Sequence, residues 1–259
     1  MPFFNFKEKN IHYITEGSGE VVVFLHGFLE NGSMWEEIAL DISKTHQVIR
    51  LDLPGFGQSD CIQAIHSMQL FAEYTKHLLS ELKIDSFTII GHSMGGYAAL
   101  ELAKICPKKI NALILFHATA SSDSEQKKKD RDRAVKAVNK KQNVYLKTTI
   151  PLLFPLQFQK ACAPQIKKMI VEAEALNPIG IIAALKGMQE RDNNNETLSN
   201  LSCKKIYIAG TLDPILSIEV LKKEAKNNGA DFIEIENAGH MSHWENTKMA
   251  LKEIQKALS

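Results

Sequence analysis

One serine stands between small residues in the stretch GHSMGG, residues 91–96. Gly91, Ser93 and Gly95 fit the pattern G-x-S-x-G, in which a sharp turn between a strand and a helix exposes a serine hydroxyl. The apolar stretches before and after it are typical of that strand and helix, and bulky side chains at either glycine would collide in the turn. Amides at the start of the helix, that of Met94 above all, could stabilise an oxyanion. The pattern predicts a nucleophilic serine.

A nucleophilic serine needs a base, and the base needs an acid that orients it. Of the nine histidines, His240 follows the last predicted strand and is the predicted base, whereas His243 is interpreted as structural. Asp213 follows a predicted strand directly and is the favoured acid. Asp123 is its rival after the preceding strand, although it resembles part of a helix cap. The sequence thus offers Ser93, Asp213 and His240 for one site.

A second oxyanion donor is expected in the loop LHGFLEN, residues 25–31. There Gly27 lets the chain turn, and Phe28 is predicted to contribute its backbone N–H. His26 is interpreted as a brace for that loop and not as a base. The loop DLPGFGQSD, residues 52–60, should lie beside the site. Its G-x-G has no helix or third glycine in register, which argues against a dinucleotide site.

These residues need a scaffold, and the apolar pattern predicts one of alternating strands and helices. A hairpin is expected near the N-terminus, and the first forty-odd residues are otherwise interpreted as strand and turn. Strands are predicted at 3–7, 10–15, 20–27, 47–55, 86–90, 111–117, 204–210 and 231–236, and helices at 67–82, 94–105, 215–227 and 243–258. Short apolar strands separated by helices indicate a mostly parallel sheet covered on both faces.

Residues 118–195 interrupt this alternation with a predicted all-helical insertion, a candidate lid over a core formed by residues 1–117 and 196–259. Ser122 and Glu125 fit a capping box at its first helix. The insertion carries 14 Lys/Arg against 8 Asp/Glu, which we interpret mainly as a solvated helix face, with an anion-attracting lid as the alternative. Its apolar residues at 152–158 and 179–188 predict an apolar surface facing a substrate.

Composition limits the possible functions. The chain has 259 residues and a net charge of +1, which gives no argument for binding nucleic acid or an anionic membrane. No apolar run is long enough for a membrane span, and the N-terminus shows no secretory signal pattern. The four cysteines share no metal-binding spacing and are predicted to be reduced thiols of a cytoplasmic protein. We expect no cofactor and no metal ion.

The motifs HGF, DLPGFGQSD, GHSMGG, GTLDP and AGH stand in the order and approximate spacing of the α/β-hydrolase superfamily, which this chain resembles over nearly its whole length. The resemblance implies an eight-stranded sheet with a helical cap, and Ser93, Asp213 and His240 follow the family's triad order. A serine nucleophile argues against the haloalkane dehalogenase and epoxide hydrolase branches. Tyr97 stands near the place where the menaquinone-pathway synthase branch typically has an arginine.

The sequence therefore predicts a serine hydrolase that cleaves carboxylic esters of small to medium apolar acyl groups. Hydrolysis of a carbon–carbon bond in a dienone acid is the alternative with the same triad, and a thioesterase or perhydrolase are variants. A small-molecule-sensing protein on this fold is the alternative from another class, although such proteins usually have a degraded triad. The partner expected in each case is a small molecule.

Overall fold

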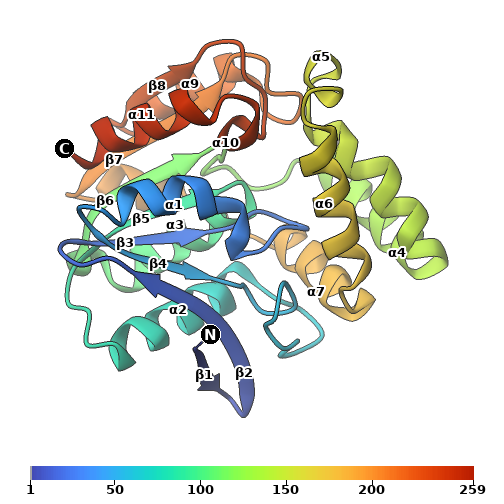
Figure 1. Ribbon diagram of the computed structural model, residues 1–259, viewed down its shortest axis with the longest axis horizontal. Helices are drawn as coiled ribbons and strands as arrows, with labels where there is room; N and C mark the ends of the chain where they lie inside the picture. The colour runs from blue at the N-terminus through green and yellow to red at the C-terminus, as the bar shows by residue number, and fades with distance from the viewer. Residues whose placement is uncertain (1) are drawn as a thin grey trace.

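A computed structural model describes residues 2–259, and its centre is one eight-stranded sheet (Figure 1). The strand order is β1-β2-β4-β3-β5-β6-β7-β8. The β1–β2 and β2–β4 pairs are antiparallel, and all the other pairs are parallel. The strands are β1 (Phe3–Phe6), β2 (Lys9–Glu16), β3 (Val21–Leu25), β4 (Gln47–Leu51), β5 (Phe87–His92), β6 (Ile110–Phe116), β7 (Lys204–Gly210) and β8 (Asp231–Ile235). The mostly parallel eight-stranded sheet predicted from the sequence is confirmed.

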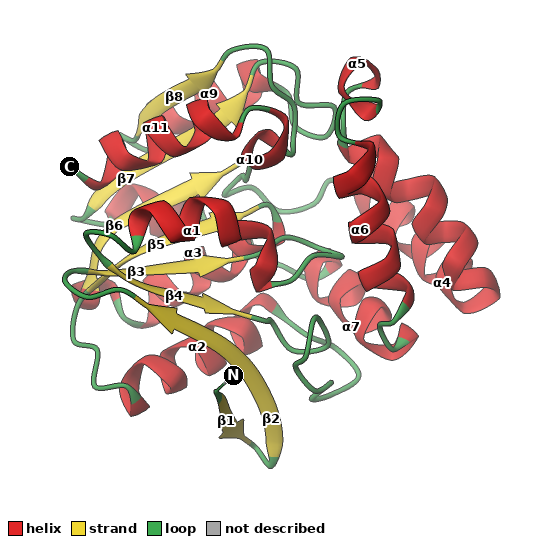
Figure 2. Cartoon of the chain, viewed as in Figure 1, coloured by secondary structure: helices red, strands yellow, loops and turns green. Residues whose placement is uncertain are grey.

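Helices cover both faces of this sheet (Figure 2). One face packs against α1 (Glu36–Ile42) and α11 (Thr247–Leu258), and the other against α2 (Met68–Glu81), α3 (Met94–Ile105) and α9 (Ile218–Asn227). Alternate residues of β3 show why: Val22 and Phe24 lie in the apolar cluster on the α1 side, while Val23 and Leu25 lie in the cluster on the α2 side. A strand buried on both faces must be apolar at every position.

A helical segment joins β6 to β7 and lies beyond the carboxyl edge of the sheet (Figure 1). We call residues 118–195 the inserted segment. It contains α4 (Glu125–Thr149), η3 (Ile150–Leu153), α5 (Leu156–Gln159), α6 (Ala163–Glu174) and α7 (Pro178–Gln189), and α8 (Asn195–Asn200) leads from it into β7. Helix α4 departs from helical backbone angles at Lys141.

The helix starts and ends differ from the prediction in three places. Ser124, not Ser122, caps α4, because its side chain accepts a hydrogen bond from the Lys127 N–H. Residues 32–42, interpreted as extended or turn, form η1 (Gly32–Trp35) and α1. The final predicted helix is two helices, α10 (Ser242–Glu245) and α11, because the Asn246 backbone (φ −149°, ψ 60°) is not helical and its side chain caps α11.

Within residues 2–259, no helix combines the length and apolarity that a membrane span requires. All four cysteines are free.

Candidate active site

The carboxyl ends of the parallel strands meet at one edge of the sheet, where α/β proteins hold their ligands. Five loops follow strands β3, β5, β6, β7 and β8 there. In that order they carry Phe28, Ser93, His117, Asp213 and His240. Residues far apart in the sequence are thereby brought to one place.

Ser93 occupies a strained turn between β5 and α3. Its backbone has φ 49° and ψ −113°. Residues other than glycine rarely adopt this backbone conformation, and functional sites often retain it. A methyl group on Gly91 would lie 2.4 Å from the Gly95 carbonyl oxygen, and one on Gly95 would lie 2.5 Å from the Leu25 carbonyl oxygen. The two glycines therefore permit the close approach of β5, α3 and β3 that forms the turn.

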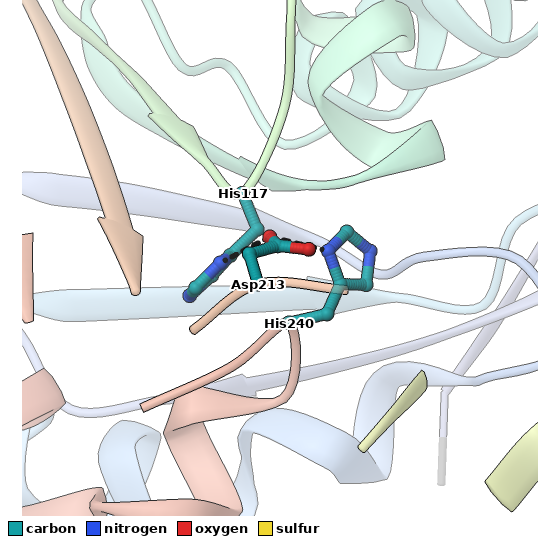
Figure 3. Close-up of side chains that lie close together, drawn as sticks. All are labelled: His117, Asp213 and His240. Carbon is teal, nitrogen blue, oxygen red and sulfur yellow. Dashed lines mark hydrogen bonds and ion pairs between the residues drawn. The ribbon is translucent and has the colours of Figure 1, made fainter. Parts of the chain in front are cut away.

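Asp213 and His240 form a buried pair (Figure 3). His240 Nδ1 lies 2.8 Å from Asp213 Oδ2, and the other carboxylate oxygen accepts hydrogen bonds from the Ile215 and Leu216 amides at 2.7 and 3.0 Å. Burial opposes ionisation of Asp213, but the two neighbouring histidines outweigh it and hold the pKa of this carboxyl well below its usual value. Asp213 is thus held as a carboxylate that fixes the orientation of the His240 ring.

A second histidine contacts the same carboxylate, and sequence reasoning missed it. His117 Nδ1 lies 3.0 Å from Asp213 Oδ2 (Figure 3). The other ring nitrogen, Nε2, lies 2.6 Å from the Ser242 hydroxyl. Burial lowers the pKa of His117 to about 4, so the ring is neutral at pH 7 and holds one proton. We assign that proton to Nδ1, which donates to Asp213, while Nε2 accepts from Ser242. The available signal was its place directly after β6, at the edge where the predicted site residues gather.

His92 precedes Ser93 in the sequence, and its ring connects two loops. Its Nδ1 lies 2.9 Å from Glu30 Oε2, and its Nε2 lies 3.0 Å from the His240 carbonyl oxygen. The Gly27 amide donates to the same Glu30 oxygen. Burial opposes charge on His92, but the Glu30 carboxylate reverses this and raises the pKa of the ring. This network ties the loop after β3 to the loop that carries His240.

Two other histidines behave as the sequence indicated. His26 Nε2 accepts a hydrogen bond from the Leu53 amide at 2.8 Å, which braces the loops after β3 and β4. His243 is buried against Trp35 and Trp244 and does not line the cavity described next.

Ser93 and His240 line one cavity of about 540 Å³. Its walls include Phe28 from the loop after β3 and Tyr97 from α3, and the inserted segment contributes much of the remainder. Of the ten apolar residues that predicted a lid surface, Leu153, Leu185 and Met188 line the cavity. Among the others, Phe154 and Ile181 are buried and Phe158 and Ile182 are half-buried. The rest, Leu152, Leu156 and Ile179, are exposed to solvent.

Asp123 also lines this cavity, but its carboxylate is engaged by arginines. Arg131 donates to both of its oxygens, and Arg191 donates to Oδ1. Burial alone would raise the pKa of Asp123, but the two guanidinium groups lower it. The structure therefore pairs His240 with Asp213, whereas Asp123 pairs with Arg131 and Arg191 within the inserted segment.

His117, Asp213 and His240 also form a set of potential metal ligands, since one ligand atom of each lies within 4.8 Å of the others. The distances of 2.8 and 3.0 Å to Asp213 Oδ2 are hydrogen-bond distances, and each requires a proton on the histidine Nδ1. A protonated ring nitrogen cannot bind a metal. The arrangement fits two hydrogen bonds from histidines to one Asp213 carboxylate oxygen.

Glu245 makes the stability of this region depend on pH. Its side chain accepts a hydrogen bond from the Gly239 amide, next to His240, and burial raises the pKa of Glu245 to about 7 from an ordinary 4.5. The folded chain then holds this proton more tightly than the unfolded chain, so the free energy of unfolding falls as pH rises from about 4.5 to 7. Glu245→Gln keeps an acceptor oxygen and removes the charge. Relative to the natural protein, this variant should gain about 1–3 kcal/mol more free energy of unfolding at pH 8 than at pH 5. This range is set below the full value of the pKa shift because the group is only partly buried.

Urea unfolding at pH 5 and pH 8 measures this difference. Glu236→Gln, at an exposed carboxylate of the same loop, is the matched control. An equal pH dependence in the two variants would contradict the role given to Glu245.

Comparisons with known proteins agree with this geometry. Residues 20–247 match the family model of the alpha/beta hydrolase fold. A solved esterase from Thermogutta terrifontis has a TM-score of 0.91 and 27% sequence identity, and the match covers 96% of this chain and 93% of that one. A pimeloyl-[acyl-carrier protein] methyl ester esterase from Legionella pneumophila is 27% identical over 249 residues, which are 93% of this chain and 95% of that protein.

An uncharacterized protein of Mycobacterium bovis is 37% identical over 102 residues, but the aligned part covers only 30% of its length and 39% of this chain. The family model, by contrast, spans strands β3 to β8, the strained serine turn and the loops that carry Asp213 and His240. The chain therefore belongs to the alpha/beta hydrolase family.

Proposed function

We propose that this protein hydrolyses carboxylic esters of small to medium apolar acyl groups through Ser93, His240 and Asp213. Ser93 Oγ attacks the ester carbonyl while His240 Nε2 accepts its proton, and Asp213 stabilises the imidazolium that forms. The protonated His240 then gives the proton to the leaving alcohol as the acyl-enzyme forms. In the second half, His240 activates a water that attacks the acyl-enzyme, which releases the acid and restores Ser93.

The developing oxyanion needs preorganised donors. We assign the amides of Phe28 and Met94 to this role, because Phe28 lines the cavity and Met94 opens α3 directly after Ser93. The N-terminus of a helix favours negative charge at this position. The Gly27–Glu30–His92 network would hold the Phe28 loop in place during this step.

The observation that carries the proposal is the convergence of two features on one cavity. Ser93 stands at a strained turn that lines it, and His240, held by the buried Asp213 carboxylate, lines the same cavity. The names of the two esterase relatives support ester hydrolysis as the reaction. The inserted segment would act as the lid of this cavity.

Labelling with a fluorophosphonate probe tests the nucleophile directly, because such probes react with activated serines. The modified peptide should contain Ser93, and the Ser93→Ala protein should stay unlabelled. Label on a different serine, or no label on a folded natural protein, would contradict the proposal.

The cavity also predicts a dependence on acyl length. Its lining includes the apolar side chains of Phe28, Leu153, Leu185 and Met188. Each buried methylene contributes up to ~0.8 kcal/mol, about fourfold in kcat/KM. The kcat/KM of p-nitrophenyl esters should therefore rise over the first few carbons and fall once the acyl chain fills the cavity. The series runs from acetyl to dodecanoyl, and a flat profile would contradict the apolar acyl site.

A further inference from the structure

The wall that the inserted segment contributes to the cavity carries three cationic side chains. Lys127 and Arg131 come from α4, and Arg191 follows α7. We call Lys127, Arg131 and Arg191 the cation cluster. The Arg191 guanidinium lies over the Tyr97 ring, 4.0 Å from its centre, so the cluster reaches from the inserted segment to the helix that begins at Ser93.

Carboxylates on the cavity wall do not balance this charge. Glu30 is paired with His92, and Asp130 with Arg133, which does not line the cavity. That leaves the single buried carboxylate of Asp123, which both arginines share. Within the cavity, the three cations of the cluster therefore face one carboxylate that is not paired with a group outside the cluster, that of Asp123.

Arg191 keeps one N–H group without a partner, and Lys127 has no carboxylate partner among the described residues. The Arg191 side chain is only 5% exposed, and its Nε is buried without a hydrogen-bond partner. Across residues 2–259, no carboxylate lies within ion-pair distance of the Lys127 ammonium. Partial burial and the nearby Arg131 charge lower the pKa of Lys127, although Asp123 and Asp130 act in the opposite direction. Buried donors are normally paired, so the unpartnered Nε of the buried Arg191, in the same cavity as the unpaired and more exposed Lys127, points to a ligand that supplies an anion.

We propose that the cation cluster binds a carboxylate of the substrate, so that the preferred substrate is an ester with a second, free carboxylate remote from the scissile bond. This inference rests on the function proposed above and deepens it. The apolar walls at Leu185 and Met188 would accommodate the spacer between the ester and the carboxylate. Asp123 already accepts from Nε and Nη2 of Arg131 and from Nη1 of Arg191. The unpartnered Arg191 Nε–H and the Lys127 ammonium would therefore be the donors to this carboxylate.

The test compares pairs of substrates that differ in this charge. In the first pair, monoethyl adipate carries the carboxylate on the acyl side, and its neutral counterpart is ethyl heptanoate. In the second pair, 4-acetoxybutanoate carries the carboxylate on the alcohol side, and its neutral counterpart is pentyl acetate. In at least one pair the kcat/KM of the charged ester should exceed that of the neutral ester by roughly tenfold or more, the scale of one charge-assisted hydrogen bond. A preference for the neutral ester in both pairs would overturn the inference.

Lys127→Gln is the variant of choice, because Lys127 forms no ion pair whereas either arginine supports Asp123. It should lower the ratio of charged to neutral kcat/KM by roughly tenfold. Lys128→Gln is the matched control on the same helix, since Lys128 pairs with Glu125 and does not line the cavity. An equal ratio in the two variants would contradict the assignment of Lys127.

Binding separates this inference from the proposed function. If no ester is hydrolysed, the proposed function is wrong, but calorimetric titration of monoethyl adipate into Ser93→Ala protein still tests the anion site. We expect binding that weakens roughly tenfold when Lys127→Gln is added and not when Lys128→Gln is added. No binding, or equal weakening by both changes, would overturn the inference.

Discussion

Ser93→Ala should reduce kcat for ester hydrolysis by about 10⁴–10⁶-fold, the usual consequence of removing a triad nucleophile. The reason is chemical and not structural. The strained turn is fixed by the approach of Gly91 and Gly95 to neighbouring backbone. Ser93 itself lines the cavity and is not part of the apolar core. The variant should therefore keep the melting temperature of the natural protein while losing turnover.

Kinetics with the best p-nitrophenyl ester of the series, together with thermal unfolding, check this expectation. Ser122→Ala is the control, because Ser122 lines the same cavity but stands on an exposed turn before α4. Its activity should stay within tenfold of the natural protein. Activity of purified Ser93→Ala within that same range would remove Ser93 from the mechanism.

The serine turn and the residues that directly follow each strand could be predicted, because a few neighbouring residues specify them. A strand that ends in G-x-S-x-G predicts its own turn, because the steric need for Gly91 and Gly95 arises within a few residues. The alternation of strands and helices then places the residues after each parallel strand at one edge. For this reason Asp213 and His240 could be proposed as partners although 27 residues separate them.

The parts that could not be predicted depend on contacts between distant segments. Nothing near His117 in sequence indicates that its ring reaches Asp213, 96 residues away. The capping residue of α4 was misplaced by two positions, since both Ser122 and Ser124 are acceptable caps by residue type alone. Likewise, the residues that directly follow Ser93 include no arginine, and nothing in them indicates that Arg191 reaches the Tyr97 ring from the end of the inserted segment.

Asp213→Asn should lower kcat by about 10⁴-fold. The Asp213 carboxylate accepts from Nδ1–H of His240, which leaves Nε2 free to accept the serine proton. An asparagine amide turned toward the ring would favour the opposite tautomer, and it would also fail to stabilise the imidazolium. The low pKa of Asp213 means that the carboxylate is ionised throughout an assay range of pH 5–9, so the loss should appear at every pH.

Asp123→Asn distinguishes this role from the other acid of the cavity. Its carboxylate balances Arg131 and Arg191, so we expect a lower melting temperature and a much smaller effect on kcat, because no contact joins it to His240. Both variants should be compared at equal concentration and at a temperature below both unfolding transitions, so that only folded protein is assayed. Because the two loops follow adjacent strands, β6 and β7, either could in principle supply the acid in this fold. A greater loss of kcat in Asp123→Asn than in Asp213→Asn would therefore move the acid to the loop after β6.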